Sequence, residues 1–338
     1  MRILVTGGRG YIGTHLVEIL KEEGHTVTDV DLNLFEGCEF EPCVTADVFL
    51  QQDFRSMEAR QLEGHDCVMH LAAISNDPMG ELDASATYSI NREGSIALAA
   101  MAKKAGVPRF LFASSCSIYG KGEKLDLTEQ DPTNPVSAYA ESKIAAEQGI
   151  GALADENFTV GFLRNSTAYG YSPMLRIDLV VNNLLACAMA RGDIRIMSDG
   201  TPWRPLIHCR DIARAFVAFA KAPAEKIQNM PINVGANAEN YQVRQIGDYV
   251  QQLVPHASIV YTGEVGNDPR NYRVSFDLLN HQIPDFKLQY TVESGMIELH
   301  RKMGEHKFSL DDFNGDRYVR LRTLKHRLDR LSLGAPSR

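Results

Sequence analysis

The sequence predicts an α/β protein, with a doubly wound, parallel Rossmann sheet followed by a smaller, mixed α/β C-terminal domain. In the first half of the chain, short runs rich in Val, Ile, Leu and Phe alternate with helical patterns, which indicates βαβ units. A glycine-rich turn directly follows the first apolar run. After about residue 166 the alternation becomes irregular. We therefore expect one domain over residues 1–166 and a second over 167–338.

The elements follow from the period of the apolar residues. Strands are expected over residues 2–7, 25–31, 66–73, 109–115 and 159–165, with helices over 14–24, 89–106 and from 135 onward. Further on, a helix is expected over 178–193 and a strand over 231–235. We expect part of the second half, around residues 207–235, to return to the first sheet. Leu321, Leu324, Leu328 and Leu331 have helical spacing, which predicts an amphipathic tail helix packed on its own domain or on a partner subunit.

Composition narrows the functional classes. The 338 residues carry a formal net charge of −8, which argues against nucleic acid or an anionic membrane as the main partner. The six cysteines are scattered without a CxxC pair, so we expect reduced thiols and no metal site. The chain starts directly with a strand, and no apolar run reaches the length of a membrane span. These features predict a cytoplasmic protein.

The turn VTGGRGYIG places Gly7, Gly10 and Gly13 between the first strand and the first helix. Such a turn directs the N–H groups at the helix start toward a pyrophosphate, and the missing Cβ atoms let the ligand approach the backbone. Asp31 ends the second strand, where a carboxylate accepts hydrogen bonds from adenosine ribose hydroxyls and repels a 2′-phosphate. This favours NAD over NADP, although the nearby Arg9 could meet a phosphate. We expect Asp47 to reach the adenine amino group.

Tyr139 and Lys143 are separated by one helical turn in PVSAYAESKIAAE. Taken alone, such a pair is typical of a helix surface. Tyr139 could also act as a base. The pKa of a tyrosine is ordinarily near 10, and an ammonium group and a positively charged nicotinamide both lower it because they favour the phenolate.

Several motifs, in order, resemble those of the extended short-chain dehydrogenase/reductase family, in its nucleotide-sugar epimerase/dehydratase branch. They are TGGRGYIG, Asp31, HLAA (70–73), the helix with Asn91, SSCSIYG (114–120), YAESK (139–143), LRNSTAYG (163–170) and RPLIHCRD (204–211). The resemblance covers nearly the whole chain. It implies an NAD-dependent enzyme that acts on a nucleotide-diphosphate sugar and forms a homodimer.

The resemblance also implies site residues. Ser115, Tyr139 and Lys143 would be catalytic, with Lys143 also holding the nicotinamide ribose. Cofactor contacts are expected from Gly7, Gly10, Tyr11, Ile12, Gly13, Asp31, Asp47, Val48, Leu71, Ala72, Ala73, Asn91, Ser114, Tyr139, Lys143 and Asn165. Substrate contacts are expected from Ser75, Ser115, Cys116, Ser117, Thr167, Asn182, Asn183, Arg204, Arg270 and Arg273. Either Asn182 or Asn183 could hold the diphosphate or sugar, and either Arg270 or Arg273 could be the second arginine on the diphosphate. His70 and His208 are interpreted as structural.

In the implied reaction, Tyr139 takes the proton from a sugar hydroxyl, usually at C4, while hydride passes to NAD⁺. The residues after Ser115 are Cys116 and Ser117, whereas 4,6-dehydratases have Asp and Glu there and decarboxylases usually have Glu at the second position. The resemblance therefore favours 4-epimerisation, with a nucleotide-sugar oxidoreductase that exchanges NAD(H) as the alternative. A silent NAD-binding module is disfavoured because it would not need the base. Thr167 and the segment 172–176 depart from the family pattern, which predicts an unusual hexose or heptose.

Overall fold

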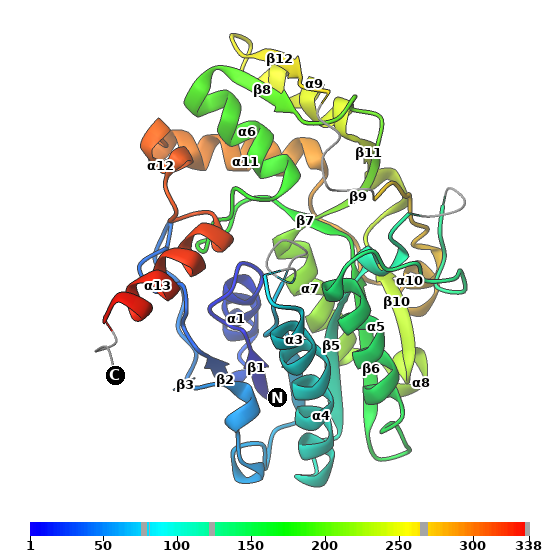
Figure 1. Ribbon diagram of the computed structural model, residues 1–338. Helices are drawn as coiled ribbons and strands as arrows, with labels where there is room; N and C mark the ends of the chain where they lie inside the picture. The colour runs from blue at the N-terminus through cyan, green and yellow to red at the C-terminus, as the bar shows by residue number, and fades with distance from the viewer. Residues whose placement is uncertain (76–79, 81, 122–125, 264–269, 335–338) are drawn as a thin grey trace.

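The computed structural model describes residues 1–75, 80, 82–121, 126–263 and 270–334. Its centre is a seven-stranded parallel sheet with strand order β10-β6-β5-β4-β1-β2-β3 (Figure 1). The strands are β1 (Arg2–Thr6), β2 (Thr26–Asp31), β3 (Val48–Gln51), β4 (Cys67–His70), β5 (Arg109–Ser115), β6 (Thr159–Asn165) and β10 (Met230–Val234). The chain winds outward from β1 to β3 and then outward on the other side from β4, so the predicted doubly wound Rossmann sheet is confirmed.

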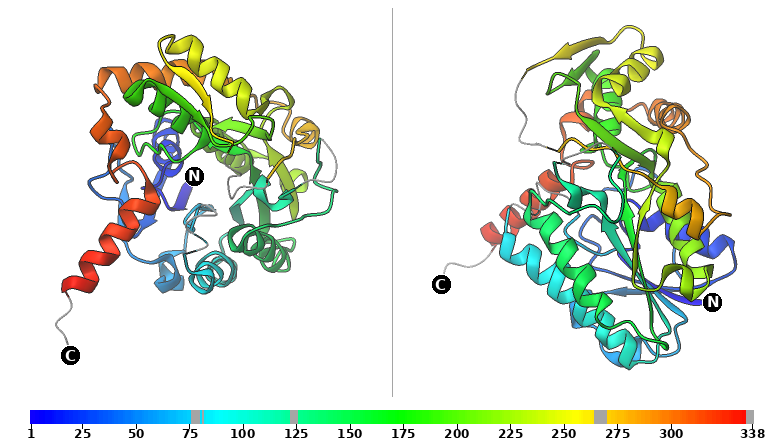
Figure 2. Two further views of the ribbon diagram at one scale, coloured as in Figure 1. Left: turned by 45° about the horizontal axis from the view of Figure 1, so that its top comes forward. Right: turned by 90° about the vertical axis from the view of Figure 1, so that its right-hand side faces the viewer.

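Helices cover both faces of this sheet (Figure 2). The helices α1 (Gly13–Glu22), α7 (Cys209–Lys221) and α10 (Asp277–Gln282) lie on one face, while α4 (Ser95–Lys104) and α5 (Ala138–Gly151) lie on the other. Successive side chains of a strand point to opposite faces, so Ile3 and Val5 of β1 join the core beneath α1 whereas Leu4 joins the core beneath α4. Burial on both faces explains why the strands read as continuous apolar runs.

A second lobe has its own core around Leu185, Ile246 and Met296. It contains a three-stranded sheet of β11 (Asn240–Gln242), β9 (Trp203–His208) and β7 (Thr167–Tyr169), and a pair formed by β12 (Ser258–Tyr261) and β8 (Asp193–Ile196). Its main helices are α6 (Val180–Arg191), α9 (Val243–Leu253) and α11 (Val292–Glu305). The chain then passes through α12 (Leu310–Asn314) to α13 (Arg320–Gly334), the red helix of Figure 1, beside the segment that follows β2.

Shorter helical turns complete the fold. They are η1 (Phe54–Ser56), η2 (Ala59–Gln61), α3 (Ala84–Thr87), the π-helical η3 (Tyr88–Gly94), η4 (Cys116–Tyr119), α8 (Ala224–Ile227) and η5 (Asn237–Glu239). No helix among the described residues is both long and apolar enough to cross a membrane.

Three elements differ from the sequence-based expectation. The edge strand β3 was not predicted, because it is only four residues long and half-exposed. The strand expected over 66–73 ends at His70, and the next residues form a loop. In the segment around 207–235, β9 belongs to the small sheet, and only α7 and β10 join the large one. The strand β10 pairs in parallel with β6 at the edge of the large sheet.

Candidate active site at the carboxyl edge of the large sheet

The glycine turn connects β1 to α1 as a close-packed cradle. Gly7 has a φ of +82°, and a Cβ on it would lie 2.7 Å from the backbone nitrogen of Ala72. A Cβ on Gly13 would lie 2.0 Å from the carbonyl oxygen of Gly7. Gly10 closes the turn by donating to the Gly7 carbonyl at 3.0 Å. The first N–H groups of α1, at Tyr11, Ile12 and Gly13, are therefore held at an anion-binding helix start.

Two carboxylates of β2 lie beside this turn. Asp31 accepts hydrogen bonds from the backbone N–H groups of Arg9, at 3.1 Å, and Asn33, at 2.8 Å. Asp29 accepts from the Gly8 N–H at 2.9 Å and lies 3.5 Å from the Arg9 guanidinium. Burial raises the pKa of Asp29 to about 7 and also raises the pKa of Asp31. Asp29 shapes the turn, and Asp31 stands at the position expected for ribose recognition.

Asp47 and Val48 require a correction. Val48 pairs with Thr28, and Asp47 accepts from the Val27 N–H at 2.8 Å, at the amino end of β2. At about 3.3 Å per residue, this is roughly 13 Å from the carboxyl edge where Asp31 lies. Asp47 instead forms an ion pair with Lys21. The assignment to adenine was wrong because the start of β3 was not recognised.

Gln52, just beyond the end of β3, takes the position expected of Asp47. Gln51 pairs with Asp31 across the sheet, so the next residue reaches the same carboxyl edge. The side-chain nitrogen of Gln52 is buried and has no hydrogen-bond partner within the described part of the chain. The correct register of β3 would have identified this residue from the sequence.

The loop after β4 lies against the glycine turn. Leu71 and Ala72 both donate backbone hydrogen bonds of 3.0 Å to the Thr6 carbonyl, and Ala73 continues the loop. Asn91 fixes the end of this loop, since its amide accepts from the Ile74 N–H at 2.8 Å and donates to the Ile74 carbonyl at 3.0 Å.

Asn91 also donates to the Ser142 hydroxyl of α5 at 3.2 Å. The expected contact with the cofactor is therefore replaced by a positioning role. His70 is structural as predicted: its ring contacts the hydroxyls of Thr6 at 2.6 Å and Ser95 at 2.8 Å.

Lys143 links α5 to β5. Its side chain is 3% exposed, and its Nζ donates to the Ala113 carbonyl at 2.7 Å. Burial lowers the pKa of Lys143 to about 7. Tyr139 lies one turn earlier, with Nζ of Lys143 5.8 Å from its ring centroid, and Ser115 lies two residues after Ala113 at the end of β5. The chain thus brings Ser115, Tyr139 and Lys143 to the same edge of the sheet.

A buried ion pair joins α5 to β6 one helical turn after Lys143. Arg164 of β6 contacts Glu147 of α5 at 2.7 Å, and both side chains are less than 9% exposed. The Ser114 hydroxyl donates to Glu147, while Arg164 also donates to the Tyr119 hydroxyl at 3.1 Å. The Ser114 side chain therefore belongs to this network, which corrects its assignment to the cofactor.

Three polar atoms at the ends of β5 and β6 are buried without a hydrogen-bond partner among the residues that the structure describes. They are the Ser117 hydroxyl, the side-chain amide oxygen of Asn165 and the Ser166 hydroxyl. Buried polar atoms are normally satisfied, so these three indicate room for a polar ligand. Cys116 differs, because it is fully buried and its thiol contacts the Arg164 carbonyl at 3.1 Å. Its assignment to the substrate is corrected to a packing role.

Asn182 and Asn183 have different roles. The Asn182 amide is fully buried, accepts from the Gly170 N–H at 2.8 Å and donates to the Arg176 carbonyl at 2.7 Å. Further donations go to the Gly170 carbonyl and the Tyr11 hydroxyl. Asn182 thus fixes the segment after β7 and is no substrate ligand. Asn183 is half-buried and donates to the Ile177 carbonyl at 2.9 Å, which leaves its amide oxygen as a candidate acceptor.

The predicted arginines gather at the start of β9. Arg204 is 8% exposed and donates to the carbonyls of Trp203, at 2.9 Å, and Arg270. Arg273 lies 4.9 Å from the Trp203 ring and 2.9 Å from the Asp126 carboxylate. The structure therefore brings Arg204 together with the segment that contains Arg270 and Arg273, the two candidates for the second arginine. Thr167 begins β7, which pairs with β9.

Two further arginines were missed by the sequence analysis. Arg176 forms a two-pronged ion pair with Asp178, at 2.9 and 3.0 Å, and its third nitrogen lies 3.4 Å from the hydroxyl of Ser75, a predicted substrate residue. Arg320 of α13 is 3% exposed. Neither matches a motif, and no feature of the sequence brings residue 320 next to residue 176.

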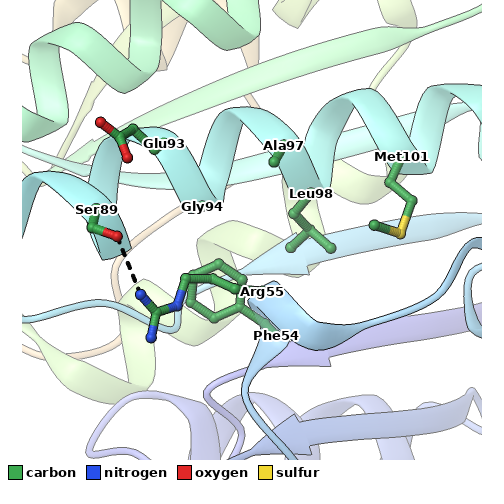
Figure 3. A pocket seen from close by; sticks show the side chains of 8 residues that line it. All are labelled: Phe54, Arg55, Ser89, Glu93, Gly94, Ala97, Leu98 and Met101. Carbon is green, nitrogen blue, oxygen red and sulfur yellow. Dashed lines mark hydrogen bonds between the residues drawn. The ribbon is translucent and has the colours of Figure 1, made fainter.

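A small cavity lies elsewhere. It measures about 220 Å³ and is lined by Phe54, Arg55, Ser89, Glu93, Gly94, Ala97, Leu98 and Met101 (Figure 3). Arg55 donates to the Ser89 hydroxyl there at 3.3 Å. None of the predicted site residues lines this cavity, so we do not assign it to the active site.

The fold and the cradle define a dinucleotide-binding Rossmann protein, with a Ser, a Tyr and a Lys toward the carboxyl edge of the large sheet. The chain belongs to the NAD dependent epimerase/dehydratase family, whose model matches residues 3–235.

Relatives of the chain carry out several reactions. It is 28% identical over 275 residues to the UDP-glucose 4-epimerase of Streptomyces lividans, covering 75% of this chain and 82% of the relative. It is 27% identical over 278 residues to UDP-glucuronic acid decarboxylase 1 of Xenopus tropicalis, covering 80% of this chain, and it spans only 64% of that relative's length.

Two solved structures extend this comparison. TunA, an NAD-dependent NDP-hexosamine 5,6-dehydratase of tunicamycin biosynthesis, superimposes with a TM-score of 0.81 and 27% identity, covering 90% of this chain and 98% of TunA. MoeE5 in complex with UDP-glucuronic acid and NAD superimposes with a TM-score of 0.78 and 26% identity. The match covers 90% of this chain and 99% of MoeE5.

NAD is the cofactor of this family, and the residues of this chain fit it. The glycine cradle admits no Cβ at Gly7 or Gly13, and Asp31 lies beside it at the end of β2. The side-chain amide oxygen of Asn165, at the ends of β5 and β6, has no hydrogen-bond partner among the residues described. When bound, NAD would accept a hydride.

Proposed function

We propose that the protein is an NAD-dependent nucleotide-sugar 4-epimerase that forms a transient 4-keto sugar. The observation that carries this proposal is the arrangement of Lys143, Tyr139 and Ser115 at the carboxyl edge of β5, together with a side chain at position 116 that is buried and carries no acid. In the proposed reaction, the Tyr139 hydroxyl loses its proton and then accepts the proton of the sugar hydroxyl. Lys143 favours the phenolate, and Ser115 hydrogen-bonds the reacting oxygen.

The local chemistry supports epimerisation over elimination or decarboxylation. Cys116 is fully buried, and burial raises the pKa of its thiol well above the ordinary value, so it is not an available acid or base. Position 117 offers a hydroxyl in place of a carboxylate. An epimerase needs no further acid/base pair, because the keto sugar takes the hydride back on its other face.

The substrate class rests on the arginines. Arg204 is a buried guanidinium at the second lobe, and a guanidinium fork suits the oxygens of a diphosphate. We propose a nucleotide-diphosphate hexose or heptose, bound between this lobe and Tyr139. Rapid conversion of UDP-glucose into UDP-galactose would contradict the unusual sugar that Thr167 and residues 172–176 predict.

Replacing Tyr139 tests the reaction. We expect Tyr139→Phe to lower turnover of a nucleotide sugar by about 10²- to 10⁴-fold, because a general base is lost, while bound NAD is retained. Tyr88→Phe is the matched control, since the Tyr88 hydroxyl contacts Glu141 on the exposed side of α5. Nuclear magnetic resonance of the sugar product, without added NAD, measures turnover.

The alternative is an oxidoreductase that exchanges NAD(H) at each turnover. Stoichiometric NADH in solution would support it and contradict the epimerase. Unchanged turnover of Tyr139→Phe would remove the catalytic role of Tyr139. The homodimer and the cytoplasmic location remain proposals, and size-exclusion chromatography with light scattering tests the first.

A further inference from the structure

Arg320, at the start of the C-terminal helix α13, is a buried cation with no ion-pair partner among the residues that the structure describes. Its Nη2 donates to the Met174 carbonyl at 3.0 Å, and its guanidinium lies 4.2 Å from the centre of the Phe35 ring. Its Nη1 is buried and has no hydrogen-bond partner in the described part of the chain, and no carboxylate described there forms an ion pair with it. Because burying an unpaired charge is costly, this arrangement indicates an anionic ligand.

Among the described residues, carboxylates near Arg320, including Asp31, interact with its charge through space but form no ion pair with it. Asp178 is bound by both prongs of Arg176, so it neutralises that arginine. Asp31 accepts two backbone N–H groups at the end of β2. Burial and the nearby charge of Arg176 lower the pKa of Arg320 to about 10, which agrees with a surrounding that does not yet balance its charge. The charges of Asp178 and Glu39 raise the pKa of Arg320.

The backbone that Arg320 contacts is fixed over the glycine turn. The Tyr11 hydroxyl donates to the Gly170 carbonyl at 2.6 Å, and the Ser172 hydroxyl donates to the Tyr11 carbonyl at 2.8 Å. Ser172 also accepts from the Met174 N–H at 3.1 Å. The segment 170–176 therefore places Met174, and with it Arg320, beside the start of α1. Backbone N–H groups at such a helix start are the usual ligands of a pyrophosphate.

We propose that Arg320 binds the pyrophosphate of the bound dinucleotide, with Arg176 beside it, so that the C-terminal helix completes the cofactor site. This helix lies outside residues 3–235, which the family model matches. It is also tied to the loop after β2, because Arg327 donates to the carbonyls of Leu34 and Glu36, and Arg317 donates to the Glu39 carbonyl.

The helix lies beside the loop that follows β2 (Figure 1), and in this proposal it would act as a strap that slows release of the cofactor. The inference rests on the NAD dependence of the family and not on the reaction proposed above.

Cofactor binding tests this inference independently of turnover. Arg320→Ala and Arg320→Gln are compared with the wild type for NAD content after purification, and for the Kd values of NAD⁺, ADP-ribose and adenosine by calorimetry. The control is Arg322→Ala, on the same helix, whose exposed guanidinium contacts the carbonyls of Asn314 and Gly315. Loss of charge-assisted hydrogen bonds should weaken NAD⁺ and ADP-ribose by about 10- to 100-fold, with adenosine unchanged. Arg322→Ala should bind as the wild type does.

Other outcomes would overturn the assignment. Equal weakening of adenosine and NAD⁺ would mean that Arg320 only supports the pocket through Phe35. Unchanged NAD⁺ affinity in both variants would exclude a contact with the cofactor. Thermal melts of the variants identify any that fails to fold. Arg320→Gln keeps a shorter, neutral side chain with an amide donor, and it provides the test if Arg320→Ala does not fold.

Discussion

At the scale of single residues, burial changes what a side chain can do. Lys143 reads in the sequence as one half of a helical surface pair, but the structure buries it against Ala113 and Phe112. Its ammonium therefore loses most of its hydration, and burial lowers its pKa to about 7, against about 10.4 in an unfolded chain. The same burial places the nitrogen of Lys143 5.8 Å from the centre of the Tyr139 ring.

The shifted pKa of Lys143 predicts a pH-dependent cost in stability. Between pH 7 and about 10.4 the unfolded chain binds more protons than the folded chain, so stability rises with pH through this window. We expect Lys143→Met to be more stable than the wild type at pH 6 to 7, and this advantage to shrink as the pH approaches 10. Urea unfolding of the cofactor-free proteins at several pH values measures it. A difference that does not vary with pH would contradict the prediction.

At the scale of elements, the start of α1 is determined by close contacts of the backbone. Gly7 is left-handed and fits against Ala72, while Gly13 fits against the Gly7 carbonyl. The motif was identified from the sequence because its glycines are needed locally. Asp29, which supports the turn through the Gly8 N–H, was not identified, because a carboxylate inside a strand pattern gives no signal of that contact.

Adding one methyl group to this turn should be harmful, whereas adding it to a free glycine should not. Gly13→Ala forces a Cβ against backbone, so we expect a loss of about 1–3 kcal/mol in the free energy of unfolding, and a loss of bound NAD. Gly304→Ala in α11 is the control, because nothing lies within 4 Å of its Cβ, and we expect it to be neutral or to stabilise by up to about 1 kcal/mol. Unfolding curves and NAD content measure both, and a Gly13→Ala protein that retains NAD would refute the role of the cradle.

At the scale of the whole molecule, Glu41 joins segments that are far apart in the sequence. It lies in the long connection between β2 and β3 and accepts hydrogen bonds from Lys302 at 2.8 Å and His306 at 2.9 Å, both at the end of α11. The Tyr171 hydroxyl of the second lobe also donates to it. These donors lower the pKa of Glu41 to about 2, with burial acting in the opposite direction.

The depressed pKa of Glu41 gives stability that is present above its unfolded pKa and is lost as the pH falls toward about 2. We therefore expect Glu41→Gln to lower the melting temperature at pH 6, and the difference from the wild type to narrow as the pH is lowered from 5 toward 3. Calorimetric melts of the two proteins across this range provide the test. A gap that widens on acidification would show that Glu41 does not carry the link.

The sequence by itself determined the Rossmann sheet and the glycine turn, because each depends on local periodicity or on residues within one or two turns of each other. Tertiary structure alone decided which polar side chains are free to meet a ligand. Ser114, Asn91 and Asn182 match site motifs, but their side chains are hydrogen-bonded to partners 6 to 171 positions away in the chain. The register of the short strand β3 places Asp47 at the amino end of the sheet, away from Asp31. The C-terminal helix packs back on the first domain, so Arg320 lies near Arg176. Contacts over such separations depend on how the whole chain packs, and no local pattern encodes them.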